Sequence, residues 1–435
     1  MKEKKQRRKR SDWKSAYLLI APSLILILII AIYPVFQSFY YSLFDLRLNE
    51  PTKSSAHLDY SLNLDEYLQY YPFLVGDLSN EIPKADQPLK RKLQKVKKEL
   101  TSLDQNIRDD AGNAYKKVNN LLNQYKTPSE KLSLVQIDGS TAAQFQKTIS
   151  DVNQKLSHIQ KQQKMGNVKQ LADLASGLKG AIIQPNFVGL KHYVHTLMDG
   201  RTLHALWHTF LFTVISVAAE FVFGFCIALL INKAFVGRGL LRAAVLIPWA
   251  VPTAVSAMMW SYLYDGQNGI VAKFFADIGI IPDMATLLTS GTGALFAVIL
   301  VDVWKTTPFM ALLLLAGLQV IPKNLYEASA IDGAGKVKQF FKVTLPLMKS
   351  SILVALLFRT LEAFRVFDLV YVLTGGGPGN STEMISGYAY RVMFSQTNFG
   401  KGSALAIIVF LCVAIISMIY IKFLGSDLLS DGSKR

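Results

Sequence analysis

The sequence is poor in charged residues and in cysteine. Only 18% of its 435 residues are Asp, Glu, Lys or Arg, whereas soluble proteins carry about a quarter. Its two cysteines, Cys226 and Cys412, lie inside apolar runs, so no disulfide framework is expected. Hydrophobic residues make up 51% of the chain and occur in long runs. This pattern excludes a string of ordinary soluble domains and predicts a multispanning membrane protein.

Motifs for nucleotide and metal chemistry are also missing. Gly335-Lys336 resembles the end of a phosphate-binding loop, but Ala330 stands where its first glycine is needed and Val337 replaces the Ser or Thr. His204 and His208 are four residues apart, yet no carboxylate cluster accompanies them. We therefore expect no catalytic residues, no metal site and no cofactor in this chain.

Six segments are long enough to cross a bilayer core, which needs about 20 apolar residues per helix. They are Tyr17–Tyr41, Leu203–Ile231, Gly239–Leu263, Gly293–Ile321, Leu347–Leu373 and Gly402–Leu424. The first has a basic flank but no small-residue cleavage site, so we expect a retained helix rather than a signal peptide. The expected fold is an all-α membrane protein with six transmembrane helices.

Lys and Arg are distributed unevenly around these spans. They gather in the N-terminus and in the loops after spans two and four, whereas the loops after spans three and five hold few. Cytoplasmic loops are the ones enriched in Lys and Arg. The net charge of +16 is therefore assigned to cytoplasmic segments and not to nucleic-acid binding. We expect a multi-pass protein of the bacterial cell membrane with both termini in the cytoplasm.

The spans divide the chain into five parts. These are a basic N-terminus (1–16), a first membrane helix (17–43), an extracytoplasmic insertion (44–201), a five-helix core (202–425) and a cytoplasmic tail (426–435). Within the insertion, two apolar stripes alternate steps of four and three: Leu89, Leu93, Val96, Leu100, Leu103, Ile107, and Phe145, Ile149, Val152, Leu156, Ile159. They predict an antiparallel helical hairpin, which serves either to dock an external partner or as a self-packed spacer.

The loop 322–346, between spans four and five, has a distinctive pattern. Its opening proline starts a short helix, and the small residues Ala328-Ser329-Ala330 allow another surface to approach closely. Gly333 and Gly335 break that helix, and Pro346 sets the start of the next span. A helix, a bend and a second helix on the cytoplasmic face form a shape that docks into a groove on a partner.

This loop resembles the Glu-Ala-Ala loop of ATP-binding-cassette importer permeases. The segments that carry the resemblance are Glu327-Ala328-Ser329-Ala330, Gly333, Leu345-Pro346, Phe187–Leu190, Ile247–Pro252 and Leu373–Pro378. Together they are similar to the carbohydrate-uptake subfamily, and most to maltose/maltodextrin permeases that carry an extracytoplasmic insertion. The long insertion itself is not covered by these motifs.

The resemblance implies a transport subunit and not an enzyme. A separate cytoplasmic ATPase dimer would bind ATP and Mg, and would pull on Glu327, Ala328, Ser329, Ala330, Asp332, Gly333, Leu345 and Pro346. The spans would then expose a midplane site to each side in turn, which is alternating access. The other implied partners are a second homologous permease subunit, an extracytoplasmic sugar-binding protein, the carbohydrate substrate and the lipid bilayer.

Charged residues inside the spans ask for an explanation, because each is costly in a bilayer. The resemblance implies that the middles of spans four and five line the sugar pathway, through Lys305, Thr306, Phe309, Arg359, Glu362, Ala363 and Val366. Polar side chains with an aromatic ring suit a sugar. The alternative is that the charges only pair within the bundle, Arg359 with Glu362 and Arg365 with Asp368.

Two further features of the spans stay open at this stage. Pro248 and Pro252 in span three predict either a hinge or gate or a static kink. Glu220 in span two is a further buried acid whose partner the sequence does not identify. Two other functions remain possible: an ion-coupled secondary transporter, and a membrane-anchored scaffold that acts through the outside hairpin.

Overall fold

The computed structural model describes residues 17–162, 166–233 and 235–432. The predicted basic N-terminus, 1–16, lies outside the described residues, as do the last three residues of the predicted tail. The chain forms two compact units. We call the first the membrane unit; it comprises Met1–Phe39, Lys191–Gln396 and Lys401–Arg435. We call the second the insertion unit; it comprises Tyr40–Leu190 and Thr397–Gly400.

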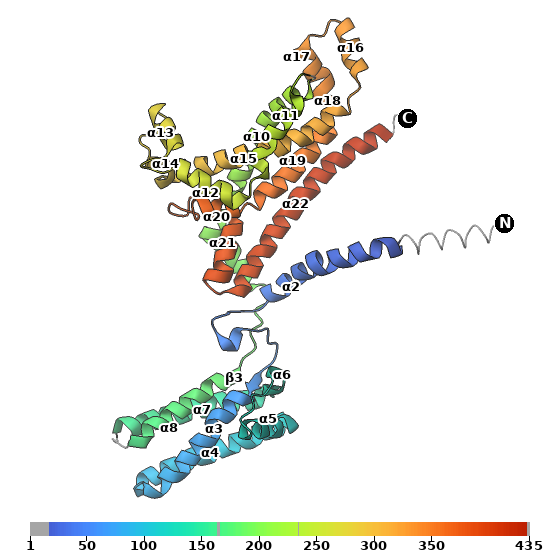
Figure 1. The fold of residues 1–435 in the computed structure, drawn as a ribbon. Coiled ribbons are helices and arrows are strands. Elements are labelled where there is room, and N and C mark those ends of the chain that lie inside the picture. The colour runs from blue at the N-terminus through green and yellow to red at the C-terminus, as the bar shows by residue number, and fades with distance from the viewer. Residues whose placement is uncertain (1–16, 163–165, 234, 433–435) are drawn as a thin grey trace, which may run out of the picture. The chain divides into compact units, whose positions relative to one another are not determined.

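The insertion unit is a helical bundle with one small sheet (Figure 1). Its α-helices are α3 (Leu64–Glu81), α4 (Gln87–Ala111), α5 (Asn113–Asn123), α6 (Glu130–Ser133), α7 (Gly139–Gln162) and α8 (Gly166–Gly177). Short 3-10 turns are η2 (Pro51–Lys53), η3 (Ile82–Lys84) and η4 (Leu178–Ala181). Strands β1 (Ser61–Asn63), β2 (Leu134–Gln136) and β3 (Ile182–Ile183) form an antiparallel sheet in the order β2-β1-β3. This sheet was not expected from the sequence.

Both predicted apolar stripes of the insertion are buried. Helices α4 and α7 run antiparallel, because Lys155 pairs with Glu99 while Gln144 pairs with Asn106. The pair does not form a closed hairpin, however. Helices α3, α5 and α8 pack into the same hydrophobic core. For example, α3 contributes several fully buried residues, including Leu74. The amphipathic stripes identified two helices of this bundle, and the remaining helices complete its core.

The membrane unit contains four helices long and apolar enough to cross a bilayer, at Tyr17–Ser42, Gly200–Asn232, Gly291–Gln319 and Phe399–Phe423. Two further pairs pass the same test but are sharply bent. Arg238–Ala250 and Thr253–Leu263 meet at 88°, and Lys336–Leu347 and Lys349–Phe364 meet at 69°. Within the described residues, the count is thus four single helices, or up to six spans if each bent pair is one span. The helical character that the sequence predicted is confirmed.

The elements of the membrane unit follow one another in short steps. The first span contains a π-helical stretch η1 (Leu28–Ile32) and α2 (Tyr33–Ser42), whose last three residues belong to the insertion unit. Then come α9 (Lys191–Met198), α10 (Gly200–Asn232), α11 (Arg238–Ala250), α12 (Thr253–Leu263), α13 (Ile270–Asp277), α14 (Thr286–Thr289) and α15 (Gly291–Gln319). They are followed by α16 (Lys323–Ile331), α17 (Lys336–Gln339), η5 (Phe340–Thr344), α18 (Leu345–Leu347), α19 (Lys349–Phe364), α20 (Asp368–Leu373), α21 (Ile385–Tyr390), η6 (Arg391–Ser395) and α22 (Phe399–Gly432).

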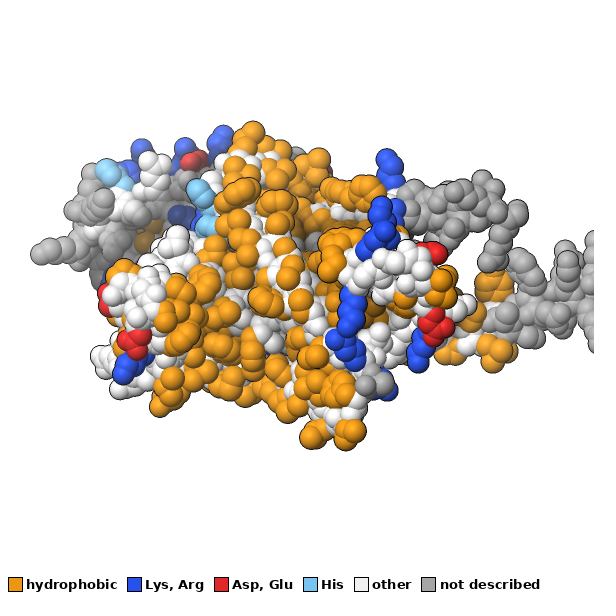
Figure 2. All heavy atoms as spheres, turned by 90° about the horizontal axis from the view of Figure 1, so that it is seen from above, with side chains coloured by type: hydrophobic (Ala, Val, Ile, Leu, Met, Phe, Trp, Pro, Cys, Tyr) orange, Lys and Arg blue, Asp and Glu red, His pale blue; other side chains and the backbone are white. Residues whose placement is uncertain are grey.

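Helix α15 is the centre of the membrane unit. In its most apolar window 67% of the residues are buried, against 39% for α10 and 22% for the last span. Helix α10 approaches α15 closely at Gly224, where a Cβ atom would lie 2.8 Å from Met310 Cγ. Small residues permit such contacts between membrane helices. Figure 2 shows broad areas of hydrophobic side chains on the surface, as expected for faces that meet lipid.

The fifth predicted span is wrong at its end. It was expected to run to Leu373, but α19 ends at Phe364 and the chain turns before α20 begins at Asp368. Arg365 has left the helical conformation, and its Nε donates a hydrogen bond to the Leu361 carbonyl. Arg365 and Asp368 are therefore not one turn apart on a continuous helix, so the helical pairing predicted for them does not apply.

Candidate functional site

A buried cluster of charges joins three helices of the membrane unit. Arg359 on α19 has only 1% of its surface exposed. Its Nε and Nη2 donate to the two carboxylate oxygens of Glu220 on α10, at 2.5 and 2.7 Å. Its Nη2 also lies 3.4 Å from Oδ2 of Asp302 on α15, and its Nη1 lies 2.7 Å from Oε2 of Glu362. One guanidinium thus holds α10, α15 and α19 together.

Thr306 adds a neutral partner to this cluster. Its hydroxyl lies 2.8 Å from Glu220 Oε1 and 2.5 Å from the Asp302 carbonyl. The cluster then contains three carboxylates and one guanidinium. Glu220 and Asp302 are buried, whereas 55% of the Glu362 side chain is exposed. Buried charges are tolerated in a membrane only when paired. Arg359 is the cation that contacts both buried acids, and Glu362 is the member that reaches outward.

A second feature is the break in span three. Helix α11 ends at Ala250 and α12 begins after Pro252, at an angle of 88°. The Lys305 ammonium donates a hydrogen bond to the Val251 carbonyl at this break. An ammonium at the C-terminal end of a helix compensates the negative end of its dipole. Of the two predicted hinge prolines, Pro252 lies at the break, whereas Pro248 lies inside α11.

An aromatic pair lies on the same two helices as this break. Trp249 of α11 stacks on Phe309 of α15, with ring centres 5.5 Å apart and planes 11° apart. Trp249 is 45% exposed and Phe309 is half-buried. The break, Lys305 and this stack therefore combine a cation with aromatic surface on helices α11 and α15.

The structure does not place all predicted pathway residues on one surface. Glu362 and Phe309 are accessible, while Lys305, Thr306, Arg359 and Ala363 are buried. Val366 lies beyond the end of α19 and is half-buried. Arg359, Glu362 and Val366 have the i, i+3, i+7 spacing of one helical face, but α19 ends at Phe364, so Val366 does not continue the face of the other two.

The loop between α15 and α19 has the predicted helix–bend–helix form. Helix α16 ends in a motif in which the Gly333 amide donates to the Ala330 carbonyl at 3.0 Å and the Ala334 amide donates to the Ser329 carbonyl at 2.9 Å. This motif requires a left-handed residue, and Gly333 has φ +77°. A Cβ at Gly333 would meet nothing within 4 Å. Glycine is thus required there by backbone conformation and not by space.

Side chains hold the two arms of this loop together. The Tyr326 and Thr344 hydroxyls are 2.9 Å apart. The amide group of Gln339 donates to the Tyr326 carbonyl and to the Ser329 hydroxyl, both at 3.1 Å. These hydrogen bonds connect α16 to the segment that leads into α19. Sequence reasoning did not identify Tyr326 or Gln339, since single polar residues in a loop give no pattern.

The predicted coupling residues are mostly accessible. The exposed ones are Glu327, Ala328, Ala330, Asp332, Gly333 and Pro346, while Ser329 and Leu345 are half-buried. Two large apolar residues beside them also face outward: Ile331 is 88% exposed and Val337 is 73% exposed. Exposed large apolar residues close together are typical of a surface that contacts another protein.

Sequence reasoning missed the partner of Glu220, which is Arg359 some 139 residues further along the chain. An acid in one span and an arginine in another suggest an ion pair because their charges are opposite. The sequence does not say which acid pairs with which base, since several combinations are possible. Among the described residues, no group of three or more His, Cys, Asp or Glu that could hold a metal ion is found.

The membrane unit thus combines long apolar helices, two bent helix pairs and a helix–bend–helix loop whose arms are joined by hydrogen bonds. Residues 220–428 match the family described as the inner membrane component of binding-protein-dependent transport systems. The chain is 45% identical over 236 residues to the trehalose/maltose transport system permease protein MalF of Thermococcus litoralis, covering 54% of this chain and 79% of that protein. The chain belongs to this family. The expectation of a permease of the carbohydrate-uptake subfamily of ATP-binding-cassette importers is confirmed.

One further sequence relative and one solved structure are also similar to this chain. The trehalose transport system permease protein SugA of Mycobacterium tuberculosis is 43% identical, covering 55% of this chain and 76% of that protein. A crystal structure of a bacterial ABC transporter involved in the import of the acidic polysaccharide alginate matches 55% of this chain and 84% of that chain, at 22% identity and a TM-score of 0.50. This last likeness shows the fold alone.

Proposed function

We propose that the chain is the membrane-spanning subunit of an ATP-driven importer for an oligosaccharide of the maltose/maltodextrin class. A trehalose/maltose permease and a trehalose permease are among its relatives, which supports an α-glucoside substrate. The proposed partners are a second homologous permease subunit, a cytoplasmic ATPase dimer that carries ATP and Mg, and an extracytoplasmic sugar-binding protein. Both termini are proposed to lie in the cytoplasm of a bacterial cell, and the insertion unit outside.

The rigid loop with Gly333 is the observation that carries this proposal. It presents Glu327, Ile331 and Val337 on its surface, and hydrogen bonds connect its two arms ahead of α19. A partner that grips α16 would therefore move α19, and with it the Arg359 cluster. Such movement exposes the substrate site to one side at a time.

The substrate pathway is proposed to use the accessible residues of the two features described above. Phe309 with Trp249 supplies an aromatic face, and Glu362 supplies hydrogen-bond acceptors. Lys305, Thr306 and Arg359 are buried in this conformation, so their contribution is to position α11, α10 and α19. Ala363 and Val366 follow Glu362 in the sequence and are proposed to shape the same wall.

The test is purification of the complete membrane complex with its co-purifying subunits, followed by reconstitution and measurement of ATP hydrolysis and maltotriose uptake. An importer of this kind hydrolyses ATP faster when binding protein and sugar are added. Uptake that follows an ion gradient without ATP identifies a secondary transporter instead and refutes the proposal.

A matched pair of glycine variants tests the coupling loop. Gly333→Ala forces a side chain into the left-handed region, at a cost of about 1 kcal/mol per residue, and distorts the end of α16. Gly335→Ala is the control, because Gly335 has φ −66° and open space around it. We expect Gly333→Ala to lower sugar uptake per ATP hydrolysed while Gly335→Ala behaves as wild type. Equal coupling in both variants contradicts the lever role.

A shortened chain separates the permease from the scaffold interpretation. The His57 carbonyl accepts a hydrogen bond from the Asn186 amide at 3.0 Å, so a short Gly-Ser linker from His57 to Asn186 can replace residues 58–185 without straining either end. This removes the complete bundle core instead of exposing half of it. A permease keeps ATP-driven uptake in the shortened form, whereas a scaffold that works through the bundle loses its function.

A further inference from the structure

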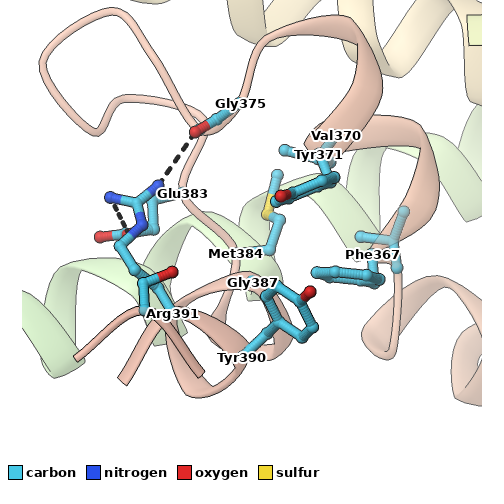
Figure 3. Close-up of a pocket in the computed structure, with 12 residues that line it drawn as sticks. Phe367, Val370, Tyr371, Gly375, Glu383, Met384, Gly387, Tyr390 and Arg391 are labelled. Atoms are coloured by element: carbon cyan, nitrogen blue, oxygen red, sulfur yellow. Dashed lines mark hydrogen bonds and ion pairs between the residues drawn. The ribbon is translucent and has the colours of Figure 1, made fainter. Parts of the chain in front are cut away.

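A small pocket in the membrane unit shares Val366 with the predicted sugar pathway and is otherwise lined by residues not assigned to that pathway. It is formed by α20, the glycine-rich turn after it, α21 and η6 (Figure 3). Helix α19 has 16 residues and lies between this pocket and the coupling loop, a length of about 24 Å at 1.5 Å per residue. The pocket is therefore at the end of span five opposite to the coupling loop.

One wall of the pocket consists of aromatic rings. Phe367 stacks on Tyr371 with ring centres 5.2 Å apart, and Tyr390 lies 5.0 Å from Phe367 and 5.6 Å from Tyr371. The three rings gather on the same side of the pocket in Figure 3. Tyr371 is 55% exposed and Tyr390 is 39% exposed, so ring surface is available to a ligand.

The opposite wall is polar and fixed. Arg391 Nη1 lies 3.0 Å from Glu383 Oε1, and its Nη2 donates to the Gly375 carbonyl at 3.0 Å. The Glu383 carboxylate is also held by Arg201, at 2.7 Å. A guanidinium has five N–H donors, and these contacts occupy only some of those on Arg391. The wall therefore offers further donors beside a buried acceptor.

The floor of the pocket is kept open by a glycine inside a helix. Gly387 lies in the middle of α21 and lines the pocket. Glycine in a helix costs about 1 kcal/mol relative to alanine. Neither a left-handed backbone nor a tight contact requires it, because a Cβ there would meet nothing within 4 Å. A larger side chain at this position would instead fill the pocket.

We propose that this pocket is a further carbohydrate-binding site, which adjoins the predicted pathway at Val366 and on which one pyranose ring of the transported oligosaccharide lies. Sugars present an apolar ring face beside hydroxyl groups, which match an aromatic wall beside fixed polar groups. The cavity is small, about 40 Å³, so it supports one ring on its surface and does not enclose a whole sugar. The inference rests on the proposed sugar transport, which it extends to the face where the substrate arrives.

The test compares two helix glycines that both face open space. Gly387→Leu fills the pocket, and Gly76→Leu in α3 of the insertion unit is the control. The reconstituted complex is assayed for ATP-driven maltotriose uptake over a range of sugar concentrations. We expect Gly387→Leu to raise KM about tenfold, equivalent to about 1.4 kcal/mol, with the maximal rate unchanged. Tyr371→Leu should act in the same direction, and Gly76→Leu should match wild type.

A second readout does not depend on transport. The detergent-purified complex is photolabelled with maltotriose that carries a diazirine, and the label is located by mass spectrometry. Label on residues 385–396 that is lost in Gly387→Leu and kept in Gly76→Leu supports the site. If this labelling is found but uptake fails, the site is supported and only the proposed transport function is refuted. The proposed site is refuted if wild-type complex does not carry this label, or if a lipid occupies the pocket and sugar does not displace it. An unchanged KM in Gly387→Leu refutes it as well.

Discussion

Replacing Arg359 by glutamine tests how far the buried charge cluster stabilises the membrane unit. The change removes the cation that contacts Glu220 through two hydrogen bonds and Asp302 at 3.4 Å. Glu220 and Asp302 then remain in a buried site, where the Thr306 hydroxyl can donate to the Glu220 carboxylate but contacts only the backbone carbonyl of Asp302. The substitution keeps a polar side chain but leaves the acids without their countercharge.

The expected loss is about 3–5 kcal/mol, the range found when one partner of a buried ion pair is removed. A smaller value has to be considered, because polar contacts between membrane helices average only about 0.6 kcal/mol when the unfolded state also finds partners. The larger range applies here, since Arg359 is 1% exposed and Glu220 is fully buried. The contact with Glu362 adds little, as that side chain is mostly exposed.

Thermal unfolding of the purified complex measures this loss, with Arg365→Gln as the matched control. Arg365 is exposed, and its Nε bonds the Leu361 carbonyl, so its replacement should cost no more than about 0.5 kcal/mol. The double variant Glu220→Gln with Arg359→Gln removes both charges of the closest pair. We expect it to be less destabilised than the sum of the single variants, with a coupling energy of roughly 1–3 kcal/mol. Equal stability of Arg359→Gln and Arg365→Gln, or strict additivity in the double variant, refutes the reasoning.

Two further predictions follow from contacts elsewhere. Lys305→Met leaves the Val251 carbonyl at the break of span three without its donor, so it should lower stability by about 1–3 kcal/mol; in thermal unfolding, a shift no larger than that of exposed Lys273→Met argues against the capping role. In the insertion unit, burial raises the pKa of Asp45, but hydrogen bonds from Lys53 and Arg47 outweigh it and hold the pKa below its ordinary 3.8. Because the folded pKa is lowered, this stabilisation is present above about pH 4 and is lost as the pH falls through the lowered pKa. The stability advantage of wild type over Asp45→Asn should therefore be larger at pH 7 than at pH 2; an advantage that is the same at both values excludes this cause.

The sequence by itself determined the class of the protein and the form of its coupling loop. Apolar runs predict membrane helices because a bilayer leaves backbone groups no other partner than their own helix. The positions of Gly333 and of the prolines predict the helix–bend–helix, since these residues restrict the backbone locally. The stripe from Leu89 to Ile107 likewise identified α4, because helical periodicity is a local property. The resemblance of this loop to a permease family could also be recognised from the sequence, because the residues of its motif are close together in the chain.

Only the tertiary structure decided which charges pair and which surfaces are open. Arg359 had a sequence neighbour, Glu362, as a candidate partner, yet its closest partner is Glu220 on another helix. Local spacing does not report which helices pack together. Local spacing also does not report where α19 ends. The residues up to Leu373 are apolar enough to continue the helix, but the chain turns after Phe364 and a separate helix, α20, begins at Asp368. The pocket at Gly387 is formed by segments that meet only after the chain has turned, so the pattern of any single segment could not reveal it.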